Sequence, residues 1–177
     1  MSIQFIGSTH EPTRVGRVLF DWWHGLEEDH ASRAIVRRAA SPTAVALTGP
    51  YQRLYRRLLK AGWPADATDG QDERLAAIVG LLAHVRDDTA RSSGGSQSIS
   101  AAMSQRRTDR PLVSELRFRR LLESPDSDSL FTALRRVLPL MDYRIDVLGL
   151  ANDFFYWGDA VRKRWAYDYQ WPEEKKT

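Results

Sequence analysis

Apolar residues recur at helical intervals along the chain. Val15, Val18, Leu19 and Trp22 follow the i, i+3, i+4, i+7 spacing that gives a helix one buried face. The same kind of spacing predicts further helices over residues 30–41, 50–61, 75–85, 98–105, 111–122, 130–138, 145–155 and 159–169. No run alternates between apolar and polar residues as a half-buried strand does. The pattern therefore predicts an all-α fold.

Residue types that start or stop helices support several of these boundaries. Asp29 is placed to cap the second helix, Pro50 occupies a favoured first-turn position, and Gly62 is expected to end that third helix. In the second half of the chain, Asp109-Arg110-Pro111 predicts a helix start. Asp142 predicts the cap of a later helix.

The segment from residue 87 to 97 reads DDTARSSGGSQ and contains no apolar anchor. Polar stretches rich in glycine and serine are typical of flexible linkers. We therefore predict two small helical bundles, residues 1–90 and 98–177, joined by a flexible linker. A chain of 177 residues with 42% apolar residues is large enough to bury a core in each.

The chain has no cysteine. This absence excludes disulfides, thiol catalysis and cysteine-based zinc sites. No segment approaches the roughly 20 consecutive apolar residues that span a bilayer, and no N-terminal stretch has the basic and apolar pattern of a secretory signal. A cytoplasmic protein is the expectation.

Basic residues are segregated from acidic ones along the sequence. Residues 31–65 contain no Asp or Glu but carry Arg33, Arg37, Arg38, Arg53, Arg56, Arg57 and Lys60. Arginine outnumbers lysine by 22 to 4 in the whole chain, and a guanidinium binds phosphate through two parallel hydrogen bonds. A single basic helix face is commonly just a solvated surface. Because no acid compensates these charges over two helices, the segment predicts contact with a polyanion.

A second basic set occurs in the second half of the chain. Its members are Arg106, Arg107, Arg110, Arg117, Arg119, Arg120, Arg135 and Arg136. Asp109, Glu115 and Glu123 are interleaved with them, so salt bridges are an equally good interpretation of this set. If both sets formed one stripe, it would contact phosphates regardless of base sequence, and binding would weaken steeply with salt.

Candidate catalytic residues are weak. His24 and His30 are six residues apart, whereas two metal ligands on one helix face need the i, i+4 spacing. Asp87 and Asp88 are adjacent carboxylates with no base nearby, which is weak support for a magnesium site. The sequence has neither a glycine-rich phosphate loop with its lysine nor a serine flanked by the glycines of a nucleophile elbow. We therefore expect no enzymatic activity, no metal and no cofactor.

The chain resembles the small subunit of the type I-E CRISPR surveillance complex Cascade, the CasB family. The resemblance covers about Val15 to Tyr169 and rests on the order and spacing of several segments. They are Leu19-Phe20-Asp21-Trp22-Trp23, Arg33–Ala39, Tyr51–Tyr55 followed by Gly62-Trp63, Ile99–Met103, Arg106-Arg107, Arg117–Leu122, Leu134–Leu138 and Phe155–Gly158.

The resemblance implies a non-catalytic all-α subunit that sits in the complex as a homodimer, holds the CRISPR RNA assembly together and stabilises the R-loop. Its expected partners are CRISPR RNA, the target DNA strands, and the large and backbone subunits of Cascade. The alternative is a helical protein–protein adaptor whose arginines meet an acidic partner. The nucleic-acid-binding surface is predicted to comprise twelve arginines: Arg33, Arg37, Arg38, Arg53, Arg56, Arg57, Arg106, Arg107, Arg119, Arg120, Arg135 and Arg136.

Overall fold

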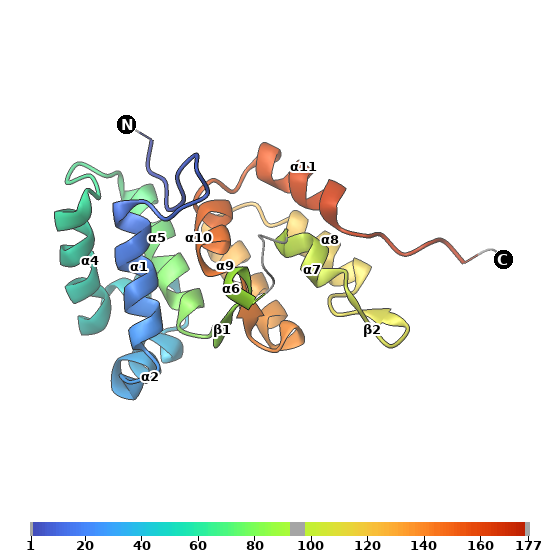
Figure 1. Cartoon of the computed structure of the whole chain (residues 1–177), viewed down its shortest axis with the longest axis horizontal. Coiled ribbons are helices and arrows are strands. Elements are labelled where there is room, and N and C mark those ends of the chain that lie inside the picture. Colours follow the sequence, from blue (N-terminus) through green and yellow to red (C-terminus); the bar gives the residue numbers. More distant parts are fainter. Residues whose placement is uncertain (1, 93–97, 176–177) are drawn as a thin grey trace.

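Helices form most of the computed structural model, which describes residues 2–92 and 98–175 (Figure 1). The first half contains α1 (Arg14–Gly25), α2 (His30–Arg38), α3 (Pro42–Ala46), α4 (Gly49–Ala61) and α5 (Asp69–Leu82). The second half contains β1 (Asp87–Asp88), α6 (Thr89–Ser92), α7 (Ile99–Met103), β2 (Arg106–Arg107), β3 (Arg110–Pro111), α8 (Glu115–Leu122), α9 (Ser127–Val137), η1 (Leu138–Met141), β4 (Arg144–Ile145), α10 (Val147–Phe155) and α11 (Asp159–Asp168). The all-α prediction is confirmed. Within the described ranges, no helix has the length and apolar character needed to cross a membrane.

Short polar side chains and one glycine set several helix ends, and Asp29 and Gly62 do so as the sequence predicted. Asp29 Oδ1 accepts a hydrogen bond from the Ser32 N–H at 3.0 Å and so caps α2. Thr68 and Gln71 cap the start of α5 reciprocally, each side chain accepting from the other's backbone N–H. Gly62 ends α4 in a left-handed conformation with a φ of 117°, which a residue without a Cβ adopts at little cost.

The helix start predicted at residues 109–111 is wrong. The chain forms a β-hairpin there, in which Arg107 of β2 pairs antiparallel with Arg110 of β3. Thr108 adopts a φ of 68° at the reversal, so the backbone at this point is turned and not helical. The helix begins later, where Ser114 accepts a hydrogen bond from the Arg117 N–H and caps α8.

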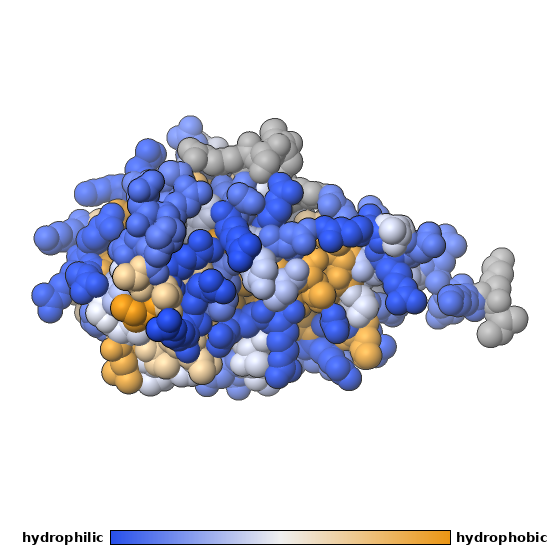
Figure 2. All heavy atoms as spheres, turned by 90° about the horizontal axis from the view of Figure 1, so that it is seen from below, coloured by the Kyte–Doolittle hydropathy of each residue, from blue (hydrophilic) through white to orange (hydrophobic). Residues whose placement is uncertain are grey.

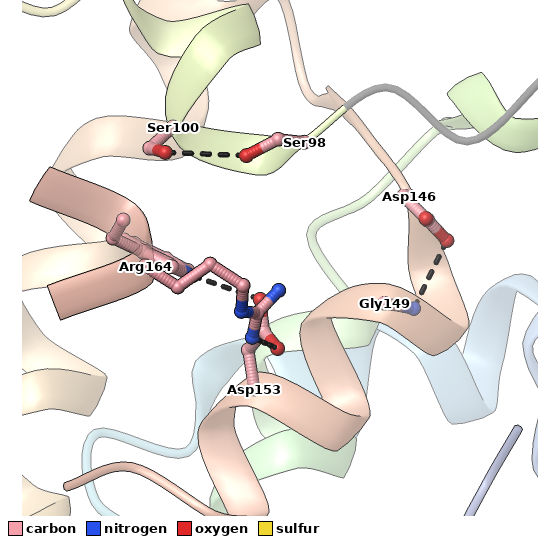
Figure 3. Close-up of polar contacts among 7 residues, drawn as sticks. Ser98, Ser100, Asp146, Gly149, Asp153 and Arg164 are labelled. Carbon is pink, nitrogen blue, oxygen red and sulfur yellow. Dashed lines mark hydrogen bonds and ion pairs between the residues drawn. The ribbon is translucent and has the colours of Figure 1, made fainter. Parts of the chain in front are cut away.

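The predicted role of Asp142 as a helix cap is also wrong. Asp142 follows η1 with a left-handed φ of 54°, and its carboxylate is paired with Arg107. The cap of α10 is Asp146, whose Oδ1 accepts from the Gly149 N–H at 2.9 Å (Figure 3). The helix therefore begins at Val147.

Helix α5 is the centre of the hydrophobic core. Every residue from Leu75 to Leu82 is buried, and α5 contacts α2, α3, α9 and α10. Gly80 permits the close approach, because an added Cβ would lie 2.8 Å from Val45 Cγ2 and 2.9 Å from Phe131 Cε2. A helical segment that is apolar on all sides must be enclosed by neighbours, as residues 75–82 of α5 are.

The division into bundles of residues 1–90 and 98–177 stays a prediction. Helix α5 lies before that division and contacts α9 and α10 beyond it, and buried residues from both sides belong to one hydrophobic cluster. The start of the predicted linker forms β1 and α6, and Asp87 of β1 pairs in parallel with Arg144 of β4. Residues 93–97 lie outside the described residues.

Phe5 holds the N-terminal segment in place. Its buried ring lies 6.2 Å from the ring of Trp63 and 6.0 Å from that of Phe155, measured between centroids. Its backbone N–H donates to Asn152 Oδ1 at 2.9 Å. The segment before α1 therefore joins the turn after α4 to α10.

A buried carboxylate fixes α11 against α10 (Figure 3). Asp153 accepts a hydrogen bond from Trp165 Nε1 at 2.8 Å and is paired with Arg164. Burial raises the pKa of Asp153, while the hydrogen bonds from Arg164 and Trp165 act in the opposite direction. The two donors satisfy a polar group that would be costly to bury alone.

Candidate nucleic-acid interface

Arg135 connects the two basic regions of the sequence. Its guanidinium, on α9, donates to the main-chain carbonyls of Arg37 and Ala39 at the end of α2, each at 3.4 Å. A cation suits this position because the last carbonyls of a helix are unpaired and carry partial negative charge. The guanidinium carbon also lies 5.4 Å from the centre of the Phe131 ring. The Arg135 side chain therefore joins the last turn of α9 to the C-terminal end of α2.

Arg33 uses its hydrogen-bond donors inside the protein. It is half-buried, and its Nε donates to the Ala83 carbonyl at 3.1 Å and its Nη2 to the Val85 carbonyl at 3.4 Å. Burial lowers the pKa of Arg33, and the positive charges of Arg37 and Arg86 lower it further. Arg33 therefore ties α2 to the residues that follow α5, and less of its guanidinium is available to a ligand.

His84 shows how much positive charge gathers at this junction. Burial lowers the pKa of its imidazole to about 4, and the charges of Arg135, Arg37 and Arg33 contribute in the same direction. Its Nε2 is buried and has no hydrogen-bond partner in the part of the chain that the structure describes. Arginines from α2 and α9 thus lie close enough to act on one ring.

Most of the twelve predicted arginines are exposed. Among the described residues, Arg107 alone of the twelve forms an ion pair with a carboxylate, that of Asp142. The salt-bridge interpretation of the second basic set therefore applies to this one member. Hydrophilic side chains cover most of the face in Figure 2, while hydrophobic groups reach the surface there in separate areas. The exposed arginines without an ion pair are Arg37, Arg38, Arg53, Arg56, Arg57, Arg106, Arg119, Arg120 and Arg136.

Arg120 and Arg136 line one shallow groove between α8 and α9. Glu123 and Asp128 share this groove, so its charge is mixed. Arg136 follows Arg135 in the sequence, which places the groove within one helical turn of the junction with α2. Two members of the second basic set, from different helices, are thereby brought into one groove.

A further basic groove lies between α1 and α4. Arg57 and Lys60 of α4 line it together with Arg14 and Arg17 of α1, and Asp21 is its acidic member. Arg14 and Arg17 were not predicted from the sequence because acidic residues separate them from the acid-free segment. Their i, i+3 spacing at the start of the first helix indicates that both lie on one helix face, and this pattern could have identified them.

The remaining predicted pair, Arg106 and Arg107, is on the β2–β3 hairpin. Arg106 Nη1 donates to the Asp109 carbonyl at 3.4 Å, and Arg107 is paired with Asp142. Figure 1 shows this hairpin and α4 toward opposite ends of the long axis of the molecule. The predicted arginines thus extend along the protein, with α2 and α9 in contact between the two extremes.

The weak catalytic candidates have structural contacts. Asp88 Oδ1 accepts a hydrogen bond from the Val147 N–H at 3.0 Å, at the start of α10. His24 stacks on Phe20 with 6.4 Å between ring centroids. Within residues 2–92 and 98–175, no three His, Cys, Asp or Glu side chains gather closely enough to hold a metal ion.

Together these elements define an all-α protein with an extended, arginine-rich surface. A family model described as CRISPR-associated protein Cse2 matches residues 32–169, which is most of the chain. The chain therefore belongs to the Cse2 family, the small subunit of the type I-E CRISPR complex Cascade, and the resemblance seen in the sequence is confirmed. No curated protein and no solved structure gave a match.

Proposed function

We propose that this Cascade small subunit is non-catalytic, acts in the cytoplasm, and binds the nucleic-acid backbone through its arginine surface to stabilise the guide RNA assembly and the R-loop. Its partners would be CRISPR RNA, the target DNA strands, the large and backbone subunits, and a second copy of itself. The observation that carries the proposal is the contact of Arg135 with the Arg37 carbonyl, which joins the basic regions of α2 and α9.

The charge state of the surface supports contact with phosphate. Arg37 and Arg38 at the end of α2 and Arg136 on α9 are exposed and have no ion pair with a described residue. Their guanidinium groups can therefore bind phosphate without first breaking a salt bridge. Backbone contacts of this kind carry no base specificity, which suits a complex in which guide pairing reads the sequence.

The arginines have different parts in this proposal. Arg33 and Arg135 direct their donors to main-chain carbonyls and position α2 against α5 and α9. Arg37, Arg38 and Arg136 would contact the ligand. Reversing the charge of the second group should thus change binding without changing the fold.

A salt titration tests the proposal. Fluorescence anisotropy would measure binding of labelled single-stranded DNA and RNA between about 50 and 300 mM NaCl. Over this range, binding that releases counterions from phosphates weakens strongly. Reversal of three charges, Arg37→Glu, Arg38→Glu and Arg136→Glu, should lower affinity at least about tenfold. It should also reduce the slope of log K against log[salt] by about 2, since each lost phosphate contact contributes about 0.7 for single strands.

The matched control reverses three exposed charges that are not among the twelve predicted arginines and do not lie on the hairpin: Arg117→Glu, Lys163→Glu and Lys175→Glu. It should retain most of the affinity, because its net charge change is the same but none of the twelve predicted arginines is altered. Affinity that does not depend on salt, or equal losses in both triple variants, would contradict the proposed surface. An acidic protein partner would then be the better interpretation of the arginines.

A further inference from the structure

A groove of about 390 Å³ lies between α3, α4 and α5, and its charge is opposite to that of the chain as a whole. Asp69, Asp72 and Glu73 line it, and among the described residues no Lys, Arg or His does. The formal net charge of the chain is +3. A negative groove on a basic protein selects against the nucleic acid that the arginines would bind.

One acidic side chain of the groove is hydrogen-bonded within the protein, and the other two are exposed. Asp72 accepts hydrogen bonds from the Tyr55 hydroxyl at 3.0 Å and from Trp63 Nε1 at 2.9 Å. Asp69 and Glu73 are exposed and form no ion pair with a described residue. Two carboxylates therefore remain available to cations from outside the chain.

An apolar side chain is presented at the same groove. Leu47 is 82% exposed, although its backbone N–H is fixed by the Thr43 carbonyl at 3.1 Å. The end of α3 is further held by Gln52, whose Nε2 donates to the Ala46 carbonyl at 2.7 Å. Leu47 is thus a large apolar group on an ordered backbone, and it lines the groove together with Tyr51.

The groove is separate from the arginine surface. Tyr51 and Tyr55 stand one turn apart on α4 and line the groove with stacked rings. Arg53, Arg56 and Arg57 of the same helix are exposed but do not line it. Helix α4 therefore carries an anionic groove on one side and cationic side chains on another.

We propose that this groove binds a basic segment of a neighbouring Cascade subunit, with an apolar side chain set against Leu47 and Tyr51 and with Lys or Arg groups meeting Asp69 and Glu73. The charge of the groove and its exposed leucine together specify this chemistry. The inference rests on membership of the complex, and it does not require that the arginines bind nucleic acid.

Photo-crosslinking in the reconstituted complex identifies the occupant. Because the chain has no cysteine, Thr43→Cys supplies a single attachment point for a benzophenone maleimide at the edge of the groove and leaves Leu47 intact. Mass spectrometry should find the probe linked to a peptide of another subunit that combines Lys or Arg with an apolar residue. A crosslink to a second copy of this chain, to RNA, or to nothing overturns the proposal.

Competitive assembly measures the contribution of the groove. Asp69→Lys with Glu73→Lys, and separately Leu47→Asp, should each be about tenfold under-represented against wild type when the complex is assembled from equal amounts. The matched control, Glu28→Lys with Asp66→Lys, reverses two exposed acids elsewhere and should be incorporated normally. Equal incorporation of groove and control variants overturns the proposal.

Two readouts separate this proposal from the others. Leu47→Asp alters a side chain that is already exposed, so thermal unfolding of this variant should match wild type even if the lysine variant is less stable. Anisotropy with single-stranded DNA should show that both groove variants bind at least as well as wild type. Loss of DNA binding with normal assembly would instead assign the groove to the nucleic-acid surface.

Discussion

The guanidinium of Arg135 on α9 donates to the main-chain carbonyl of Arg37 on α2 across 3.4 Å, although the two residues are 98 positions apart. The contact fixes the end of one helix with the side chain of another. Its neighbour Arg136 is exposed and has no such contact among the described residues. The two adjacent arginines of α9 therefore have different roles: Arg135 stabilises the fold, and Arg136 is exposed at the surface.

Truncation of Arg135 should destabilise the protein. Arg135→Ala removes two hydrogen bonds and the stacking on Phe131, so we expect the free energy of unfolding to fall by about 1–2 kcal/mol in urea denaturation. Arg136→Ala makes the same change of charge at an exposed position and should stay within about 0.5 kcal/mol of wild type. Equal effects of the two variants would show that Arg135 has no structural role.

A methyl group at Gly80 should disrupt the contact of α5 with α3 and α9. The added Cβ would approach Val45 and Phe131 to less than 3.0 Å, so Gly80→Ala should lower stability by about 1–3 kcal/mol through overpacking. At Gly25 of α1 nothing lies within 4 Å, so Gly25→Ala should be neutral or slightly stabilising. Thermal unfolding followed by circular dichroism measures both, and an unchanged Gly80→Ala midpoint would be inconsistent with this packing.

Acid should weaken the fold through His84. Its folded pKa of about 4 lies below the ordinary value of 6.5, so between these values the unfolded chain binds more protons. The stabilising contribution is therefore complete above about pH 6.5 and is lost as the pH falls toward 4. Allowing for solvent screening of a partly exposed ring, we expect a loss of about 1–2 kcal/mol.

The His84→Gln variant isolates the contribution of His84 to the pH dependence of stability, because glutamine does not titrate. Urea unfolding of both proteins at pH 4.5 and pH 7.5 would give the comparison. The stability of wild type should fall more than that of the variant between the two pH values. A parallel fall in both proteins would assign the acid sensitivity to other groups.

The groove between α1 and α4 should contribute to nucleic-acid binding. Arg14→Glu with Arg17→Glu should weaken binding of single-stranded DNA and reduce the salt slope by about 1.4, on the basis of two lost phosphate contacts. The slope would be measured by the same anisotropy titration. A variant with the wild-type slope would exclude Arg14 and Arg17 from the binding surface.

Helix ends were predictable from the sequence where the signal is local. Asp29 caps α2 through Ser32, three residues away, and Gly62 ends α4 through its own backbone. Asp142 was misassigned because its partner is Arg107, 35 positions distant, and no local pattern shows that contact. The hairpin at residues 106–111 was missed for a different reason: its pairing is local, but a proline is a poor strand signal and a good helix-start signal.

The candidate surface was predictable as a set of charges but not in its geometry. Helical periodicity placed the arginines on exposed faces, as most of them are. It could not show that Arg33 and Arg135 reach carbonyls of Ala83 and Ala39, which lie 50 and 96 positions away. Nor could it show that Arg14 lies in one groove with Arg57. Side-chain partners distant in sequence are fixed by tertiary packing, which no spacing rule contains.

The position of Phe5 between Trp63 and Phe155 has a consequence for synthesis on the ribosome. Phe5 and Trp63 emerge long before α10 is made, so their rings lack the third member of the cluster for most of translation. Helix α5 likewise lacks α9 and α10 until late. The apolar part of α5, from Leu75 to Leu82, therefore stays incompletely covered until the last third of the protein has been made.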